Sequence, residues 1–368
     1  MTGNTFGRIF RITTFGESHG PALGVVVDGC PSRLGLGDGD VNAELAKRRP
    51  GQSAISTPRA EEDKAEILSG LFEGKTTGAP IAITIRNTNA NPAAYASIKD
   101  VFRPGHADFG YWAKFGFRDW RGGGRSSGRE TAGRVAAGAV AKKLLFRFGV
   151  TVLARVVEAA GVKAKPLEVS EKNIDALTKA VYSNEVRCAD AGTGKKMASA
   201  IQKARESGDS TGGIVEVVAV GAPSGLGEPV FDRLDAELAK ALMSIPSVKG
   251  VEFGSGFGSA GMRGSENNDA FVYDSKAKRA FTRTNNHGGM LGGISTGMPI
   301  VARIAVKPTS SIAKRQKTIN EDMKSVDLSV GGRHDPNICP RIAPVAEAMV
   351  ALVLVDAMML QGVIPREL

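Results

Sequence analysis

The chain of 368 residues has 42% hydrophobic residues, which is enough for a substantial core and excludes a mainly disordered protein. Its formal net charge of +10, from 48 basic and 38 acidic residues, favours an anionic partner such as nucleic acid, an acidic membrane surface or a phosphorylated metabolite. Composition alone does not choose among these partners.

Predicted strands and helices alternate along the chain. Runs rich in β-branched residues predict strands at 24–27, 81–85, 150–157, 214–220 and 300–306, and helical patterns fall at 41–48, 129–148, 171–182, 233–243 and near the C-terminus. No linker is long or polar enough to mark a boundary. We therefore predict a single α+β domain over residues 1–368.

The two ends of the chain argue for a cytoplasmic protein. The first 20 residues carry arginines and a glutamate where a signal peptide needs an apolar core. The apolar run that starts at Ile342 contains Glu347 and Asp356, which would be costly in lipid, so it predicts a buried helix rather than a membrane span. Cys30, Cys188 and Cys339 are far apart and lack zinc spacing, which predicts buried reduced thiols and no metal site.

The chain has 46 glycines, and they are densest in three stretches, "RGGGRSSG", "GVEFGSGFGSAG" and "NNHGGMLGGISTG". Such clusters are typical of sharp turns and of backbone that closely approaches a ligand. Gly256, Gly258 and Gly261 match a dinucleotide pattern, but the polar stretch that follows does not continue as a helix, so we interpret the match as accidental.

The stretch "RGGGRSSGRETAGR", residues 121–134, precedes the alanine-rich helical pattern. Serine and glycine amides at a helix N-terminus favour an anion, and Arg125 and Arg129 add guanidinium groups suited to phosphate or carboxylate. A solvent-exposed basic loop with a serine N-cap is the alternative. The glycine triplet favours an anion site.

The four histidines lie in glycine-containing loops: His19 in "TFGESHG", His106 in "FRPGHADF", His287 in "NNHGG" and His334 in "GRHDP". Histidine titrates near neutral pH and can therefore transfer protons. No HExxH or GxSxG pattern occurs, so neither zinc hydrolysis nor a serine nucleophile is indicated. The stretch "VKPTSSI" at 306–312 follows a predicted strand and offers donors for a phosphate, or else is a solvent-exposed turn.

Seven motifs, "TFGESHG", "RRPGQS", "FRPGHADF", "GGGRSSGRETA", "NNHGGMLGGISTG", "KPTSS" and "GRHDP", occur in the order and spacing of the chorismate synthase family, which this chain resembles from residue 4 to about residue 360. The resemblance implies a β-α-β sandwich, a homotetramer, and loss of phosphate from 5-enolpyruvylshikimate 3-phosphate to give chorismate. It also implies reduced FMN as cofactor and NADPH as its reductant.

The resemblance also implies roles for individual residues. His19 and His106 would act as proton donors, and Asp335 would assist removal of the ring proton. The flavin would be bound by Arg125, Ser126, Ser127, Ser247, Gly292, Lys307, Pro308, Thr309, Ser310, Ser311 and Arg333. Substrate or NADPH anions would be bound by Arg48, Arg49, Arg129 and Arg134. Many family members carry a further arginine where this chain has Ala54, so its NADPH pattern is incomplete.

Two other classes fit part of this pattern. A basic RNA-binding or ribosome-associated protein would share the net charge. The aromatic content of 6%, the lack of an RNA-binding aromatic pattern and the lack of a basic helix argue against this class. A flavin-binding module without catalysis would not need His19, His106 and Asp335. We therefore expect a small-molecule enzyme with no nucleic-acid or membrane partner.

Overall fold

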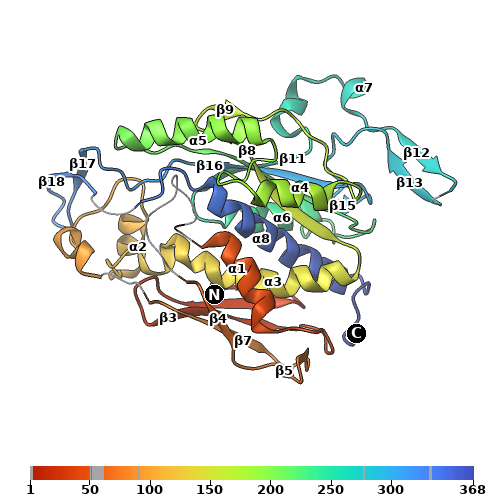
Figure 1. The fold of residues 1–368 in the computed structure, drawn as a ribbon, viewed down its shortest axis with the longest axis horizontal. Coiled ribbons are helices and arrows are strands. Elements are labelled where there is room, and N and C mark those ends of the chain that lie inside the picture. The colour runs from red at the N-terminus through yellow and green to blue at the C-terminus, as the bar shows by residue number, and fades with distance from the viewer. Residues whose placement is uncertain (1–2, 50, 52–61, 89–91, 277, 331–333) are drawn as a thin grey trace.

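The computed structural model describes residues 3–49, 51, 62–88, 92–276, 278–330 and 334–368. Two five-stranded antiparallel sheets enclose a layer of helices (Figure 1). The first sheet has the order β1-β2-β3-β7-β4, with β1 Thr5–Phe6, β2 Arg11–Gly16, β3 Ala22–Asp28, β7 Ile81–Arg86 and β4 Ala65–Ile67. The second has the order β11-β16-β10-β8-β9, with β11 Val248–Phe253, β16 Ile300–Val306, β10 Gly213–Val220, β8 Thr151–Ala159 and β9 Val162–Lys163.

Four helices form the middle layer: α1 Asp38–Arg48, α3 Thr131–Arg147, α6 Leu234–Met243 and α8 Cys339–Leu360. Helix α3 packs on β3 of the first sheet, α8 packs on β8 and β10 of the second, and the two helices pack on each other. The α+β sandwich that the family resemblance implies is confirmed.

Small residues let α3 approach its neighbours. A Cβ atom at Gly133 would lie 2.9 Å from the carbonyl oxygen of Gly24 in β3, and one at Gly138 would lie 2.3 Å from the Cβ of Ala348 in α8. Side chains at either position would push the layers apart. The alanine- and glycine-rich composition of α3 therefore follows from its place between a sheet and a helix.

The predicted C-terminal helix is confirmed as buried. Helix α8 is long and apolar enough to cross a membrane by length and composition, but 94% of its most apolar window is buried inside the protein. Cys30, Cys188 and Cys339 are also free and buried, as predicted.

The second sheet is covered on both faces. Val215, Val217 and Ala219 of β10 face the helix layer, whereas Val218 and Val220 pack with Leu153, Val169, Ile174 and Val181 on the other side. Helix α4 Ile174–Tyr182 supplies part of this outer cover, and α5 Ala191–Glu206 packs at β8 and β9.

The remaining elements lie in the connections. They are helices α2 Asp108–Phe115 and α7 Gly264–Asn267; the hairpins β5 Leu71–Phe72 with β6 Lys75–Thr76, β12 Phe271–Asp274 with β13 Arg279–Thr282, β14 Met290–Leu291 with β15 Ile294–Ser295, and β17 Gln316–Ile319 with β18 Ser325–Leu328; and 3-10 turns at Pro92–Ile98, Gly124–Ser126, Gly128–Glu130 and Gly256–Gly261. The loops that carry most of the predicted site residues lie in these connections.

Candidate functional site

The glycine- and arginine-rich loop enters α3 through a capped turn. Gly122, Gly123 and Gly124 all have positive φ, at 68°, 89° and 51°, which explains the triplet. The hydroxyl of Ser127 accepts a hydrogen bond from the backbone N–H of Arg129, so a serine caps this turn, as the sequence predicts. Ser126 donates its hydroxyl to the carbonyl of Gly123 at 2.7 Å.

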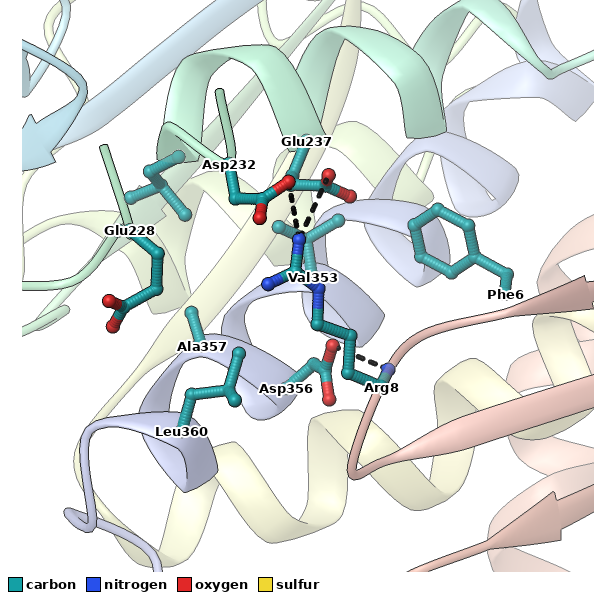
Figure 2. Close-up of a pocket in the computed structure, with 11 residues that line it drawn as sticks. Phe6, Arg8, Glu228, Asp232, Glu237, Val353, Asp356, Ala357 and Leu360 are labelled. Carbon is teal, nitrogen blue, oxygen red and sulfur yellow. Dashed lines mark hydrogen bonds and ion pairs between the residues drawn. The ribbon is translucent and has the colours of Figure 1, made fainter. Parts of the chain in front are cut away.

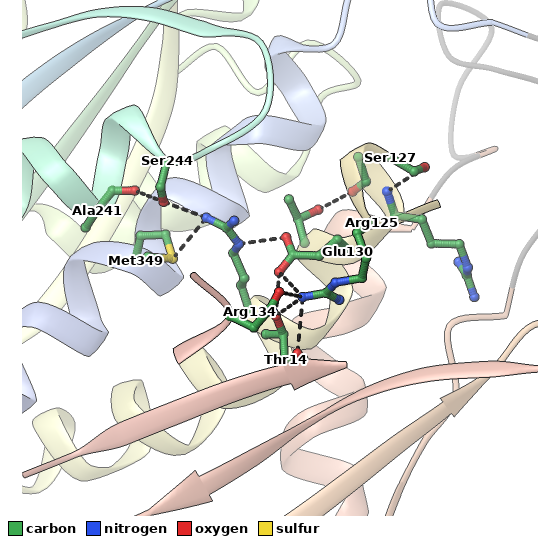
Figure 3. Close-up of polar contacts among 12 residues, drawn as sticks. Thr14, Arg125, Ser127, Glu130, Arg134, Ala241, Ser244 and Met349 are labelled. Atoms are coloured by element: carbon green, nitrogen blue, oxygen red, sulfur yellow. Dashed lines mark hydrogen bonds and ion pairs between the residues drawn. The ribbon is translucent and has the colours of Figure 1, made fainter. Parts of the chain in front are cut away.

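Arg125 ties this loop to the first sheet (Figure 3). Its guanidinium donates to the carbonyls of Gly16 and Thr14, to the Thr14 hydroxyl at 2.7 Å and to the Asn4 side chain. Glu130 accepts from Thr14 and from Arg134, both at 2.8 Å. The Arg134 guanidinium also reaches Ser244 after α6, which joins the loop to the helix layer.

A cavity of about 430 Å³ lies at this junction. Its lining includes Arg125, Ser126, Glu130, Arg134 and Pro246. This volume is within the range of about 300–1,000 Å³ that is usual for small-molecule sites. Ser247 follows Pro246, and its carbonyl accepts the backbone N–H of Lys307, so this cavity lies next to the start of the 307–311 loop.

The 307–311 loop carries an unpaired buried donor. Thr309 Oγ1 is buried and has no hydrogen-bond partner among the described residues. Lys307 and Ser310 bind the carbonyl of Gly105, which attaches the loop to the His106 segment. A buried hydroxyl without a hydrogen-bond partner lowers the stability of the folded state unless a ligand supplies the partner. The loop is therefore suited to binding a ligand such as a phosphate group or a flavin.

His19 is buried and enclosed by three groups. Its Nδ1 lies 3.1 Å from the Ser18 hydroxyl, and its ring meets that of Tyr95 edge to face at 5.2 Å. The backbone of Gly122 approaches so closely that a Cβ there would lie 2.3 Å from the ring. The arginine-rich loop and the first catalytic candidate are therefore in direct contact.

His106 contacts the 307–311 loop. Its Nε2 lies 2.9 Å from the hydroxyl of Ser311, and its Nδ1 lies 3.0 Å from the carbonyl of Pro104. Burial, and then the positive charge of Arg103, lower the pKa of His106 to about 4. The imidazole is therefore neutral near pH 7, with the proton on Nδ1 because a carbonyl only accepts.

Arg103 is a site residue that the sequence motifs do not predict. It binds both carboxylate oxygens of Asp108, at 2.7 and 2.8 Å, and lies over the ring of Tyr95. The spacing of arginine and aspartate within "FRPGHADF" was its only signal. Arg103 links the surroundings of His19, through Tyr95, to those of His106.

Asp335 pairs with Arg341 at 2.5 Å. The Arg341 guanidinium also donates to the carbonyl of Arg48, the last residue of α1. Two residues after Asp335, Asn337 donates to Thr211 and to the carbonyl of Gly212, which lies against Pro308. Contacts therefore run from Asp335 both to α1 and to the 307–311 loop.

Arg48 and Arg129 share one buried carboxylate, that of Asp63. Arg48 Nη1 lies 2.8 Å from Asp63 Oδ2 and Arg129 Nη1 lies 2.6 Å from Oδ1, and the Asp63 side chain has no exposed surface. Burial would raise the pKa of Asp63, but the two arginines outweigh it and the pKa is lowered. No motif marks Asp63, so the sequence alone does not identify it.

Arg48 is not open to a ligand in this arrangement. It is 1% exposed, and its guanidinium also donates to Thr131 and to the carbonyl of Gly128. Burial, partly offset by Asp63, lowers its pKa to about 10. Arg49 is exposed. Direct contact of these arginines with an anion stays a prediction.

One predicted flavin residue lies apart from the others within the chain. Gly292 is in the β14–β15 turn, and this hairpin contacts Pro299 and Ile300 at the start of β16, whereas Lys307 follows the end of that strand. Arg333 and Ala54 lie outside the described residues.

Two other hollows contain no predicted site residue. A small pocket is lined by Arg8, Asp232, Glu237 and Asp356, and Arg8 fills much of it by pairing with Asp232 (Figure 2). A groove of about 1090 Å³ lies between the approach to α4 and the β12–β13 hairpin. Among the described residues, no cluster of histidine, cysteine and carboxylate side chains could hold a metal ion.

Comparison with known proteins matches this architecture to one family. Residues 10–359 match the family model described as chorismate synthase. The chain is 59% identical over 365 residues to a chorismate synthase of Methanocella arvoryzae, covering 99% of this chain and 96% of that one, and 55% identical over 370 residues to one of Methanosarcina mazei, covering both fully. A crystal structure described as that of chorismate synthase superposes with a TM-score of 0.77 at 33% identity, covering 97% of this chain and 93% of that one. The chain belongs to the chorismate synthase family.

Proposed function

We propose that His19, His106 and Asp335 are the proton-transfer groups of this chain in the reaction of its family. That reaction is a 1,4-elimination in which 5-enolpyruvylshikimate 3-phosphate loses phosphate and a ring proton to give chorismate, the last step of the shikimate pathway. The observation that carries the proposal is the unbroken series of contacts among the loops that hold these three residues.

The charges around the site suit this substrate. It has two carboxylates and a phosphate, and Arg103, Arg125, Arg134 and Lys307 supply positive charge beside the cavity and the His106 loop. The positive charges of Arg103 and Lys307 oppose protonation of His106. A bound anion beside His106 would offset those charges and raise the pKa of His106, which favours the protonated form that can donate a proton.

The family uses reduced flavin, and the described loops offer groups that would hold it. Arg125, Ser126, Ser127, Ser247 and the 307–311 loop would bind FMN, with Thr309 as a hydroxyl in need of a partner. Reduced FMN, when bound, supplies electron density to the breaking carbon–oxygen bond. The neutral His106 imidazole, with its Nδ1 proton held by the Pro104 carbonyl, would take up and release a proton at Nε2, which lies beside Ser311.

NADPH is the proposed reductant of the flavin, and exposed Arg49 offers a positive charge for its phosphates. A homotetramer, which the family resemblance implies, is the proposed assembly, and a second subunit would allow Gly292 to approach a 307–311 loop. A cytoplasmic location agrees with the burial of α8 between the sheets.

The proposed roles are tested by anaerobic turnover with reduced FMN and 5-enolpyruvylshikimate 3-phosphate, with phosphate release as the signal. We expect His19→Ala and His106→Ala each to lower kcat by about 10²-fold or more, because each removes a proton-transfer group, while flavin and substrate bind nearly normally. Full activity of either variant would refute its role. Absence of phosphate release by the wild-type protein, together with salt-sensitive RNA binding, would instead favour a nucleic-acid-binding function.

A further inference from the structure

The side chain of Asn87 binds both ends of the loop that carries His19. Its Nδ2 donates to the carbonyl of Glu17 at 2.9 Å and to that of Gly20 at 2.8 Å, the residues on either side of Ser18 and His19. Its backbone N–H donates to the carbonyl of Pro21. Asn87 therefore binds the backbone at both ends of the loop that contains His19.

The sheet explains why Asn87 lies there. Strand β3 begins directly after the His19 loop and pairs with β7, with Ala22 opposite Arg86. Asn87 is the first residue beyond β7, so the register of the sheet brings it beside the end of the loop. The side chain then needs only its own length to reach both carbonyls.

Arg129 decides which way the Asn87 amide points. Arg129 Nε donates to Asn87 Oδ1 at 2.5 Å. A guanidinium only donates hydrogen bonds, so the oxygen of the amide must face it and the NH₂ group must face the loop. Both hydrogens of that group then meet a carbonyl.

Arg129 is itself fixed by Asp63. The Asp63 carboxylate also binds Arg48, so it neutralises part of the repulsion between two buried guanidinium groups. The order of contacts is thus Asp63, Arg129, Asn87 and the His19 loop. We propose that Asn87 is a positioning residue for His19, and that Asp63 holds Asn87 in place through Arg129.

This inference rests on the proposed role of His19, since an inert His19 would need no positioning. Contacts of the ring with Ser18, Tyr95 and Gly122 restrict its orientation, whereas the loop sets the position of the His19 backbone and hence the distance of the ring from a substrate. A displacement of about 1 Å of a catalytic group can cost about 10²-fold in rate.

The test is Asn87→Asp, which keeps the size of the side chain and its acceptor for Arg129 but replaces the NH₂ donor with an oxygen that repels both carbonyls. We expect kcat to fall by about 10-fold to 10²-fold, with the KM for the substrate changed by less than about 3-fold. Asn87→Ala removes both hydrogen bonds to the loop without adding a charge and should also lower kcat. It serves as the second variant if Asn87→Asp does not fold.

A double-mutant cycle separates positioning from general stabilisation. If Asn87 acts through His19, Asn87→Asp should cause no further loss of rate in the His19→Ala protein, whereas independent effects would multiply. Asn184→Asp is the matched control, because the Asn184 side chain also donates to two carbonyls, that of Ala180 in α4 and that of Cys188 in the loop after α4. It should retain wild-type kcat.

The outcomes are distinguishable. Full activity of His19→Ala would overturn the proposed role of His19 itself. A slow His19→Ala protein combined with a multiplicative loss in the double variant, or an unchanged kcat in both Asn87 variants, would overturn the inference about Asn87 alone.

Discussion

His106 shows how burial and charge set the state of a single side chain. Its pKa falls from 6.5 to about 4, first through burial and then through Arg103, so the folded protein holds the imidazole neutral at pH values where the unfolded chain protonates it. Since the unfolded state then binds more protons, folding becomes less favourable as the pH falls from about 6.5 towards 4.

We therefore predict that His106→Gln reduces the loss of stability between pH 6.5 and pH 4, the interval bounded by the unfolded and folded pKa values of His106. The measurement is the urea midpoint at several pH values for both proteins. The pKa of Asp108 is also lowered, so protonation of this carboxylate in acid destabilises both proteins. The difference in stability between the two proteins therefore reports the imidazole of His106. Identical slopes would show that His106 titrates normally.

At the scale of elements, buried charges join the helices of the middle layer. Glu347 of α8 is 1% exposed and accepts from Lys142 of α3 at 2.6 Å, from the hydroxyl of Tyr182 and from the backbone N–H of Ala154 in β8. Burial would lower the pKa of Lys142, but Glu347 and Glu44 outweigh it and the pKa is raised. The carboxylate that interrupts the apolar run thus links two helices and the second sheet.

Glu347→Ala should lower the free energy of unfolding by about 3–5 kcal/mol, because it leaves the Tyr182 hydroxyl and the Ala154 amide without a partner and removes one of the two carboxylates of Lys142. Glu44→Ala is the control and should cost less, since Glu44 is partly exposed and its partners among the described residues are Lys47 and Lys142. Denaturant unfolding of both variants measures this. A loss below about 1 kcal/mol for Glu347→Ala would contradict a role for the network in stability.

At the scale of the whole molecule, the proposed tetramer makes a prediction about shared sites. If Gly292 of one subunit completes the site of another, coexpressed His19→Ala and Gly292→Trp subunits should form some sites that contain neither substitution. Random mixing would make about one quarter of the sites intact, whereas sites built within one subunit would all keep one defect.

The measurement is phosphate release by the mixed protein, compared with each variant alone. Recovered activity near one quarter of the wild-type value would support sharing. Activity no greater than that of the two separate variants, in a preparation shown to contain mixed oligomers, would mean that Gly292 does not act across an interface.

The strands and helices that the sequence predicts are those with a clear local hydrophobic pattern. The five predicted strands appear as β3, β7, β8, β10 and β16, and the five predicted helices appear as α1, α3, α4, α6 and α8, with shifted ends. Helix α5 was missed because two glycines, Gly192 and Gly194, interrupt its pattern, although Asp190 caps it through Thr193. The hydrophobic period of strands and helices is a local property, so it can be detected without the fold.

The sequence by itself determined the family, through seven motifs in register, and the chemistry that the loops offer. Only the tertiary structure decided that Asp63 lies between Arg48 and Arg129, that Asn87 grips the His19 loop, and that the imidazole of His106 is held neutral. The physical reason is that these relations depend on burial and on contacts between residues as far apart as 205 positions, which arise only when the sheets close on the helices.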